Sequence, residues 1–271
     1  MGGSLGEKIG EGAGADIHAW APGQVVKLSK AGVPRGVGEH EARMTRAVFA
    51  AGGPAPEVLG EVTHEGRFGI VLPRLDGPTL LQLLRTRAMT LEQGGAVLAT
   101  LFLSVHTTPA PPDVLPLRVW AEAASRLPDG IPKHIATGVL TLIERLPPAE
   151  GLCHGDLHSS NVIVTAEGPR IIDWGAAVRA PAAYDLGRCH LLLTELVPEG
   201  VDPAPPRVLD AVIRSEYARL TGTSLTALTT AMERCLPILR AIALADRAWS
   251  PAQRERLIQR VEATLRSENL I

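Results

Sequence analysis

Cysteine and aromatic residues are both scarce in this sequence. The three cysteines, Cys153, Cys189 and Cys235, form an odd and widely spaced set. Such a set does not fit a disulfide framework and favours free thiols in a reducing compartment. Aromatic residues make up 3% of the chain and are scattered along it. The sequence therefore offers little material for an aromatic cage around a quaternary ammonium group.

A strong excess of charge and a long apolar run are also missing. The net charge of −2 gives no support for a nucleic-acid or anionic-membrane partner. No uninterrupted apolar run approaches the ~18 residues of a membrane span, and Met1–Lys8 lacks the apolar segment of a signal peptide. We therefore expect a cytoplasmic protein with no nucleic-acid and no membrane partner. The sequence does not indicate an oligomeric state.

The composition that remains is that of an ordinary globular protein, with 45% hydrophobic and 21% charged residues. The 271 residues suffice for one large domain or two lobes around a buried core. From Thr79 onward, helical periodicity dominates. It predicts helices over residues 79–87, 91–106, 116–127, 133–146, 182–196, 206–220, 225–249 and 252–266, with Pro237 kinking the penultimate helix or ending its first half.

The stretch from Cys153 to Gly175 holds the densest set of chemically useful side chains. Residues 162–164 are a short apolar run that predicts a buried strand, and residues 170–172 predict its partner strand. Residues 167–169 between them are of types that favour a turn. A hairpin folds the chain back on itself. The residues just before its first strand and just after its second therefore become neighbours.

Three oxygen-bearing side chains are brought together by this hairpin. Asn161 precedes the first strand, Asp173 follows the second, and Asp156 lies five residues before Asn161. Mg²⁺ prefers hard oxygen ligands and takes only a few of them from protein when it binds phosphates. The spacing Asp-x-x-x-x-Asn with a downstream Asp-x-Gly is that of kinase catalytic and metal-binding loops. The stretch thus predicts phosphoryl transfer. The alternating His154, Asp156 and His158 leave a zinc site as a second interpretation.

Glycines and one lysine mark the first third of the chain. Gly10, Gly12 and Gly14 alternate at a predicted strand–turn–strand junction, where a backbone without side chains can approach a phosphate closely. A plain flexible hairpin is the alternative reading. Lys27 is one of only four lysines and lies within a short apolar strand. The predicted helix over residues 38–51 offers it an acidic partner.

Glu41 is the expected partner of Lys27, with Glu39 as the alternative. In kinase-type sites this ion pair holds the lysine against the α- and β-phosphates. Two further strands are predicted near residues 61–62 and 68–72, and the chain then breaks at a proline.

The break at Leu72, Pro73 and Leu75 is the expected hinge. In a kinase-like arrangement adenine binds backbone groups there, through the Pro73 carbonyl and the Leu75 N–H. Because the proline would supply only a carbonyl, its missing N–H does no harm. A merely structural loop is the alternative reading.

The glycine turn, the strand lysine, the helix glutamate, the hinge and the stretch from Cys153 to Gly175 follow one another along the chain. Their order resembles that of the aminoglycoside phosphotransferase/choline kinase-like family of small-molecule kinases. The resemblance covers nearly the whole chain and is most specific at His154-Gly-Asp-Leu-His-Ser-Ser-Asn161 and Ile172-Asp-Trp-Gly175. It implies an α+β, bilobal protein-kinase-like fold. A small β-rich N-lobe at residues 1–76 and a larger, mainly helical C-lobe at residues 77–271 would together form one phosphotransferase domain.

The resemblance also implies roles for individual residues. Asp156 would be the base or orienter of an acceptor hydroxyl, and Asn161 and Asp173 would hold Mg²⁺. ATP would be the phosphate donor, with GTP as the alternative. Asp185, in Tyr184-Asp-Leu-Gly187, resembles the family's structural aspartate, which braces the catalytic loop through backbone N–H groups.

The acceptor is expected to be a small hydroxylated molecule, such as an aminoglycoside-like amino-sugar or a related metabolite. Only eleven residues separate Asp173 from Asp185, which leaves no room for the activation loop that docks peptides in protein kinases. Glu195, Glu199 and Asp202 offer a local acidic cluster for a cationic acceptor, and a solvated helix end is the alternative reading. A catalytically silent nucleotide-binding module and a metal-dependent hydrolase are the alternative functions.

Overall fold

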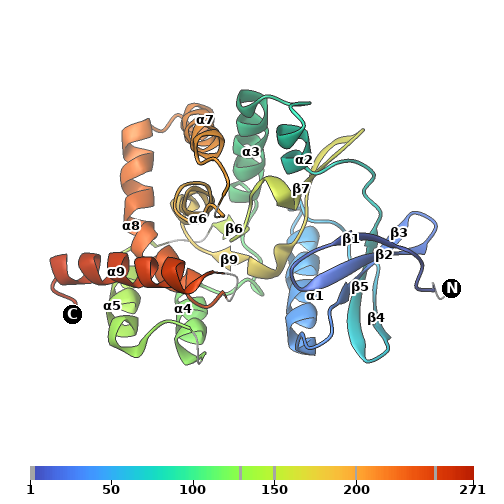
Figure 1. Ribbon diagram of the computed structural model, residues 1–271, viewed down its shortest axis with the longest axis horizontal. Helices are drawn as coiled ribbons and strands as arrows, with labels where there is room; N and C mark the ends of the chain where they lie inside the picture. The colour runs from blue at the N-terminus through green and yellow to red at the C-terminus, as the bar shows by residue number, and fades with distance from the viewer. Residues whose placement is uncertain (1–3, 128–129, 149–150, 199, 247–248) are drawn as a thin grey trace.

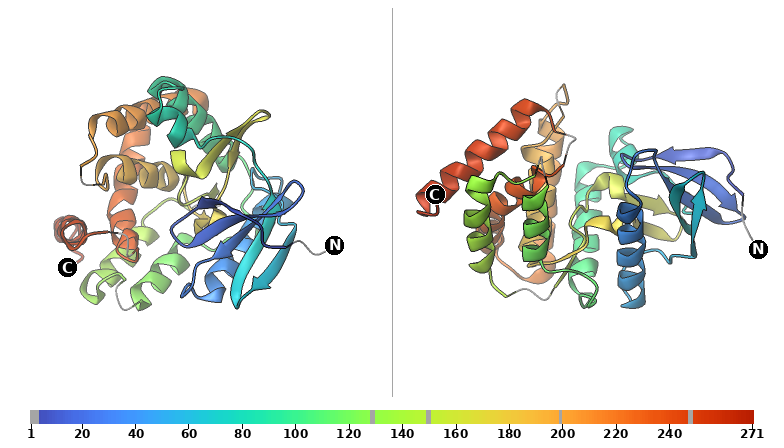
Figure 2. Two further views of the ribbon diagram at one scale, coloured as in Figure 1. Left: turned by 45° about the vertical axis from the view of Figure 1, so that its right-hand side comes forward. Right: turned by 90° about the horizontal axis from the view of Figure 1, so that it is seen from below.

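The computed structural model of the chain describes residues 4–127, 130–148, 151–198, 200–246 and 249–271. It consists of two parts that lie side by side (Figures 1 and 2). The N-terminal part is an antiparallel five-stranded sheet with one helix, and the C-terminal part is mainly helical. This arrangement confirms the expected α+β, protein-kinase-like fold class.

The N-terminal sheet has the strand order β1-β2-β3-β5-β4. In that order its strands span Lys8–Glu11, Ala15–Ala21, Gln24–Ser29, Arg67–Pro73 and Gly60–His64. Helix α1, Arg35–Ala50, covers the face that carries Lys27. Lys27 lies opposite Ile70 in the β3–β5 register, and Ile70 packs against Ala42 of α1. Because cross-strand partners point to the same face, this packing directs the lysine toward the helix.

Helix α1 also packs against the C-terminal part. Its Met44 and Val48 are fully buried in the large hydrophobic core that the C-terminal helices share. Burying a side chain of this size stabilises a fold by about 1.5–3 kcal/mol. The helix is therefore anchored to both parts, which fixes the position of every side chain that it presents between them.

The C-terminal helices form around α6, with α3 packed against α7 and α6 packed against α8. Capping boxes at Thr79, Thr90 and Ser250 satisfy the first N–H groups of α2, α3 and α9, and so set where these helices begin. The helices are α2 Leu80–Arg85, α3 Leu91–His106, α4 Leu117–Arg126, α5 Lys133–Glu144, α6 Ala182–Thr194, α7 Ala204–Thr221, α8 Leu225–Ala243 and α9 Pro251–Ser267.

Short elements carry the chain between α5 and α6. Figure 1 places β7 beside α2, where the helical part faces the sheet. Strand β6 pairs with β9, and β7 pairs with β8 in a hairpin. These elements are β6 Leu152–Cys153, the 3-10 turn η1 Ser159–Asn161, β7 Val162–Thr165, β8 Gly168–Ile171, the 3-10 turn η2 Trp174–Ala176 and β9 Val178–Arg179.

Three local predictions are wrong in detail. The helix predicted over residues 38–51 begins three residues earlier, at Arg35. The hairpin turn is Ala166–Glu167 rather than residues 167–169, because Gly168 already pairs with Thr165 and Pro169 with Val164. The Thr165 hydroxyl accepts the Glu167 N–H at 3.2 Å and donates to the Gly168 carbonyl at 2.9 Å, which closes the turn earlier.

Helix α8 ends at Ala243 rather than Trp249, and it continues through Pro237 instead of ending there. Across the described ranges, no helix is both long and apolar enough to span a membrane.

Candidate active site

The predicted ion pair between Lys27 and Glu41 is confirmed. The Lys27 Nζ lies 2.7 Å from the Glu41 Oε1 and 3.2 Å from the Asp173 Oδ2. Glu39 instead pairs with Arg35. Burial would lower the pKa of Lys27, but the charges of Glu41 and Asp173 outweigh it, so that the pKa of Lys27 is raised. The lysine is therefore charged, and it lies between helix α1 and the end of the β7–β8 hairpin.

Asp173 ends the hairpin in a left-handed conformation, with φ 68° and ψ 66°. The pairing of β7 with β8 brings Asp173 near Asn161, because the N–H of the neighbouring Ile172 donates to the Asn161 carbonyl at 3.0 Å. The Asp173 side chain is about half exposed (48%), whereas Lys27 and Glu41 are mostly covered. This sparsely populated backbone conformation holds the Asp173 carboxylate in a fixed position, with one oxygen toward Lys27.

Asn161 is buried, and its side-chain amide nitrogen has two hydrogen-bond partners. Its Nδ2 donates to the Asp156 carbonyl at 2.9 Å and lies 3.4 Å from His158 Nε2, which ties the hairpin to the loop before it. The amide nitrogen is thereby used inside the protein, and the amide oxygen remains available as an acceptor. A carbonyl oxygen beside the half-exposed carboxylate of Asp173 is a donor set that suits Mg²⁺. The two predicted metal ligands thus fit the ion that the resemblance implies.

Asp156 lies between a cation and a histidine. Its Oδ1 accepts from Arg188, with the guanidinium Nη2 at 3.1 Å and Nε at 3.3 Å, and its Oδ2 lies 3.5 Å from His158 Nε2. Burial would raise the pKa of Asp156, but the His158 hydrogen bond and the Arg188 charge lower it below its usual value. The carboxylate is therefore ionised at neutral pH and can accept a hydrogen bond from a hydroxyl group.

Arg188 is the site residue that the sequence reasoning missed. It lies on α6 three residues after Asp185, and residues three apart share one face of a helix. Because Asp185 was expected to brace the catalytic loop, this spacing was a signal that Arg188 would also reach that loop.

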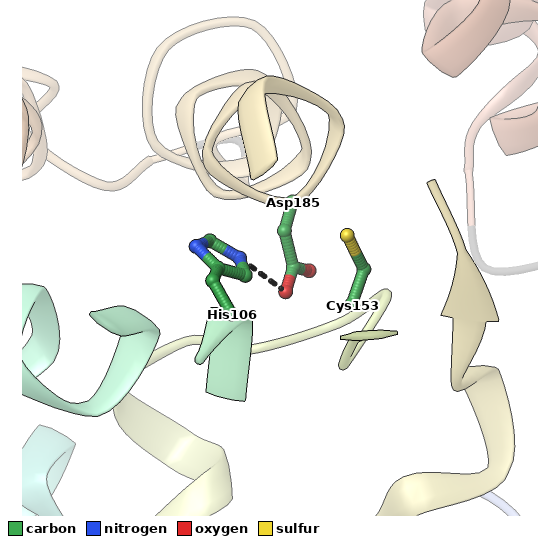
Figure 3. A group of neighbouring side chains, drawn as sticks. All are labelled: His106, Cys153 and Asp185. Carbon is green, nitrogen blue, oxygen red and sulfur yellow. Dashed lines mark hydrogen bonds and ion pairs between the residues drawn. The ribbon is translucent and has the colours of Figure 1, made fainter. Parts of the chain in front are cut away.

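The expected brace by Asp185 is confirmed. Its fully buried carboxylate accepts the His154 N–H and the Gly155 N–H, each at 2.8 Å. Figure 3 shows His106 of α3 on the same carboxylate, with Nε2 at 3.3 Å from Oδ2. The other ring nitrogen of His106 lies 2.7 Å from the Tyr217 hydroxyl of α7. Three helices thus converge on one segment of catalytic loop.

This buried group is a structural brace rather than a metal centre. His106, Cys153 and Asp185 (Figure 3) are the one His/Cys/Asp/Glu group in the described ranges whose ligand atoms lie close enough to hold an ion. The Cys153 thiol, however, donates to the Ala180 carbonyl at 3.4 Å. Both Asp185 oxygens already accept backbone N–H groups.

The alternative zinc interpretation fails at His154. Its Nδ1 accepts the Asp156 N–H at 3.2 Å, and its Nε2 donates to the Ile172 carbonyl at 3.0 Å, so that both nitrogens are in use. The ring also packs on Trp174, with centroids 4.6 Å apart. His154 therefore packs within the loop that carries Asp156. Gly155 beside it has φ +80°, and a Cβ there would lie 2.1 Å from the Ala176 carbonyl oxygen.

The glycine turn connects β1 to β2 as predicted, and the Gly12 N–H donates to the Ala15 carbonyl at 2.8 Å. Neither Gly12 nor Gly14 has a positive φ, and a Cβ at either position would meet no close neighbour. Gly10 lies within β1, opposite Ile17. The fold itself therefore does not require glycine at positions 12 and 14.

The predicted hinge residues lie where β5 ends. Leu72 and Pro73 are the last residues of β5, opposite Val25 and Gln24, and Leu75 follows two residues later. The Leu75 N–H donates to no acceptor in the part of the chain that the structure describes.

A further contact links the two parts. His40 of α1 lies with its Nε2 3.1 Å from the Gly175 carbonyl, and its ring meets Trp120 of α4 edge-on at 5.7 Å. The segment that carries Asp173 is therefore attached to the same helix that supplies Glu41. Sequence patterns gave no sign of this contact, because it joins residues 135 positions apart.

Comparison with known proteins places this geometry in a family. The sequence model of the phosphotransferase enzyme family matches residues 12–222. No curated protein matches the chain significantly.

Among solved structures, the fold is similar to aminoglycoside phosphotransferase APH(4)-Ia, a thermostable mutant in complex with AMP-PNP and hygromycin B. That match has a TM-score of 0.61 and 18% identity over 98% of this chain and 94% of the other. Aminoglycoside-3'-phosphotransferase of type VIII matches with a TM-score of 0.56 and 22% identity over 88% and 93% of the two chains.

A choline/ethanolamine kinase family protein from Mesorhizobium loti matches with a TM-score of 0.55 and 18% identity over 99% and 90% of the two chains. These identities show a common fold, and the family match covers most of the chain. The chain therefore belongs to the phosphotransferase enzyme family, the aminoglycoside phosphotransferase/choline kinase-like group of small-molecule kinases.

Proposed function

We propose that this protein transfers the γ-phosphate of ATP to a hydroxyl group of a small molecule, with Mg²⁺, and that residues 1–76 and 77–271 act together as one phosphotransferase domain. The observation that carries the proposal is the convergence of Lys27, Glu41, Asp156, Asn161 and Asp173 from four separate segments of the chain. Phosphoryl transfer depends mainly on positioning and on stabilising charge, and these residues supply both.

The nucleotide would bind between the glycine turn, Lys27 and the hinge. The fold does not need glycine at positions 12 and 14. Glycine there would instead let phosphate oxygens come close to the backbone N–H groups. Lys27 would contact the α- and β-phosphates, held in place by Glu41. The free Leu75 N–H and the Pro73 carbonyl would meet adenine, and guanine is the alternative base.

Asn161 and Asp173 would hold Mg²⁺, which would neutralise charge on the β- and γ-phosphate oxygens when bound. Asp156 would accept a hydrogen bond from the acceptor hydroxyl and direct it toward the γ-phosphorus. Its ionised state is maintained by Arg188 and His158. The three buried thiols fit a reducing compartment, and we propose the cytoplasm.

The test is acceptor-dependent formation of ADP with a panel of amino-sugars, amino alcohols, sugars and hydroxy acids. The proposal expects that ADP and a phosphorylated acceptor form in equal amounts. Thermal shifts with Mg·ATP and Mg·GTP identify the preferred donor. Nucleotide binding without transfer to any acceptor would instead favour a silent nucleotide-binding module, and tightly bound zinc would favour a hydrolase.

We expect Lys27→Met to lower kcat/KM for ATP by about 100-fold, because it removes a preorganised charge on the phosphates. It also leaves Glu41 buried without a partner, so the double variant Lys27→Met/Glu41→Gln should recover stability but not activity. Lys133→Met is the matched control, since Lys133 is exposed at the start of α5. Unchanged steady-state kinetics in Lys27→Met would contradict this assignment.

A further inference from the structure

Arg188 has donor capacity that the protein does not use. Its Nε and Nη2 both point to one oxygen of Asp156, at 3.3 and 3.1 Å. Its Nη1 makes no hydrogen bond within the described residues, although the guanidinium group carries five N–H donors. The side chain remains 15% exposed. A planar cation thus stands beside the carboxylate that any acceptor hydroxyl must approach.

The nearby carboxylates are already paired. Glu195, which follows the last residue of α6, accepts from Arg240 at 2.6 and 3.0 Å and from Arg260 at 2.8 Å. On α7, the buried Asp210 is bound by Arg214 and His190, each at 3.0 Å.

The acidic cluster expected from the sequence does not form a cation site. Glu195 is bound by its two arginines. Asp202 is exposed and accepts the Ala204 N–H at 2.9 Å, while Glu199 lies outside the described residues. Glu216, the half-buried carboxylate of α7, pairs with Arg219 at 2.8 Å. Together with the buried Asp185, these pairings leave α6 and α7 without a buried or half-buried carboxylate free to receive an ammonium group, so far as the structure describes them.

Aromatic side chains offer no substitute. Trp120 packs on His40, Trp174 packs on His154, and Tyr217 packs on His106. Each of these three rings contacts a histidine, and no two tryptophan or tyrosine rings face each other among the described residues. A cation–π cage for a quaternary amine needs such converging rings.

The charges beside Asp156 thus disfavour a cationic acceptor and favour an anionic one. An ammonium group would be repelled by Arg188, whereas a carboxylate or a phosphate would gain charge-assisted hydrogen bonds from it. We propose, on the basis of the proposed function, that the acceptor is a hydroxyl compound carrying an anionic group near the phosphorylated hydroxyl, and that Arg188 binds that group.

In the proposed reaction, the acceptor oxygen forms a bond to the γ-phosphorus while the bond from that phosphorus to the β,γ-bridging oxygen breaks. ADP leaves with the electron pair of the broken bond. The hydroxyl proton passes to the Asp156 carboxylate and then to solvent. The products are ADP, the phosphorylated anion and one proton. Arg188 takes no part in the bond changes and selects the acceptor by its charge.

The experiment compares acceptors that share a skeleton but differ in charge: serinol, glycerol and glycerate, then glucosamine, glucose and glucuronate, with kanamycin as a polycation. We expect kcat/KM to rise from the amines through the neutral compounds to the anions. In Arg188→Gln, the ratio of kcat/KM for the anion to that for its neutral partner should fall at least about tenfold. Arg188→Lys should retain part of that ratio.

The ratio separates acceptor binding from a merely structural role. If Arg188 only positions Asp156, the Arg188→Gln change lowers kcat/KM for every acceptor equally, the ratio stays constant, and the proposal is overturned. The proposal would also be overturned if kanamycin or the amines were the preferred acceptors. The same holds if a protein that binds Mg·ATP formed no ADP in response to the anionic acceptors. Arg234→Gln, on the exposed side of α8, is the control. Failure to bind any nucleotide would overturn the phosphotransferase function as well.

Discussion

Replacing Asp156 by asparagine is expected to lower kcat by about 10³-fold, within the range that a positioned proton acceptor contributes. Asparagine has the same shape and can still accept from Arg188 through its amide oxygen. It cannot, however, take up the hydroxyl proton or orient the hydroxyl with a full negative charge. The hydrogen bond from Asn161 to the backbone carbonyl of residue 156 does not depend on the side chain. The loop should therefore keep its shape, and nucleotide binding should persist.

Two measurements on each variant check this expectation: the rate of acceptor-dependent ADP formation and the thermal shift produced by Mg·ATP. Asp76→Asn is a matched control, because Asp76 also pairs with an arginine, Arg74 at 2.7 Å, but is exposed to solvent. Only the Asp156 variants, Asn and Ala, should lose turnover while keeping the nucleotide shift. An Asp156→Asn protein that turns over at the normal rate would refute the role given to this carboxylate.

Local patterns were sufficient where function depends on residues close in sequence. The hairpin that joins Asn161 to Asp173 spans a few residues, so strand propensity and a turn signal locate it. The pair of Lys27 and Glu41 also followed from local patterns, because a strand and the next helix in the chain are usually adjacent in space. The exact turn was missed because the Thr165 hydroxyl closes it one residue early.

Contacts between distant segments could not be read in the same way. His106 binds both Tyr217 and the carboxylate of Asp185 only because α3, α6 and α7 pack together. Helical periodicity identifies which side of each helix is apolar, but it does not specify which helices meet. The hydrogen bonds from His106 to Asp185 and Tyr217 therefore follow only from the fold. The paired state of Glu195 was hidden for the same reason.

Replacing Asp185 by asparagine is expected to lower the free energy of unfolding by about 3 kcal/mol. The buried carboxylate accepts two backbone N–H groups at 2.8 Å and faces His106 at 3.3 Å. An asparagine amide keeps one acceptor oxygen but turns an NH₂ group toward one of these donors. A buried donor left without an acceptor costs about 1–3 kcal/mol, and more is lost with the charge. For a chain of this size, such a loss lowers Tm by roughly 6–12 °C.

A comparison of the Tm of Asp185→Asn with the Tm of the control variant Asp202→Asn tests this expectation. Asp202 also accepts a backbone N–H, from Ala204 at 2.9 Å, but it is exposed, so water replaces the lost interaction and Tm should stay nearly constant. The Asp185 variant should also lose activity at temperatures where it remains folded, because the N–H groups of His154 and Gly155 fix the loop that carries Asp156. Equal Tm values for the two variants would show that the catalytic loop is held by other contacts.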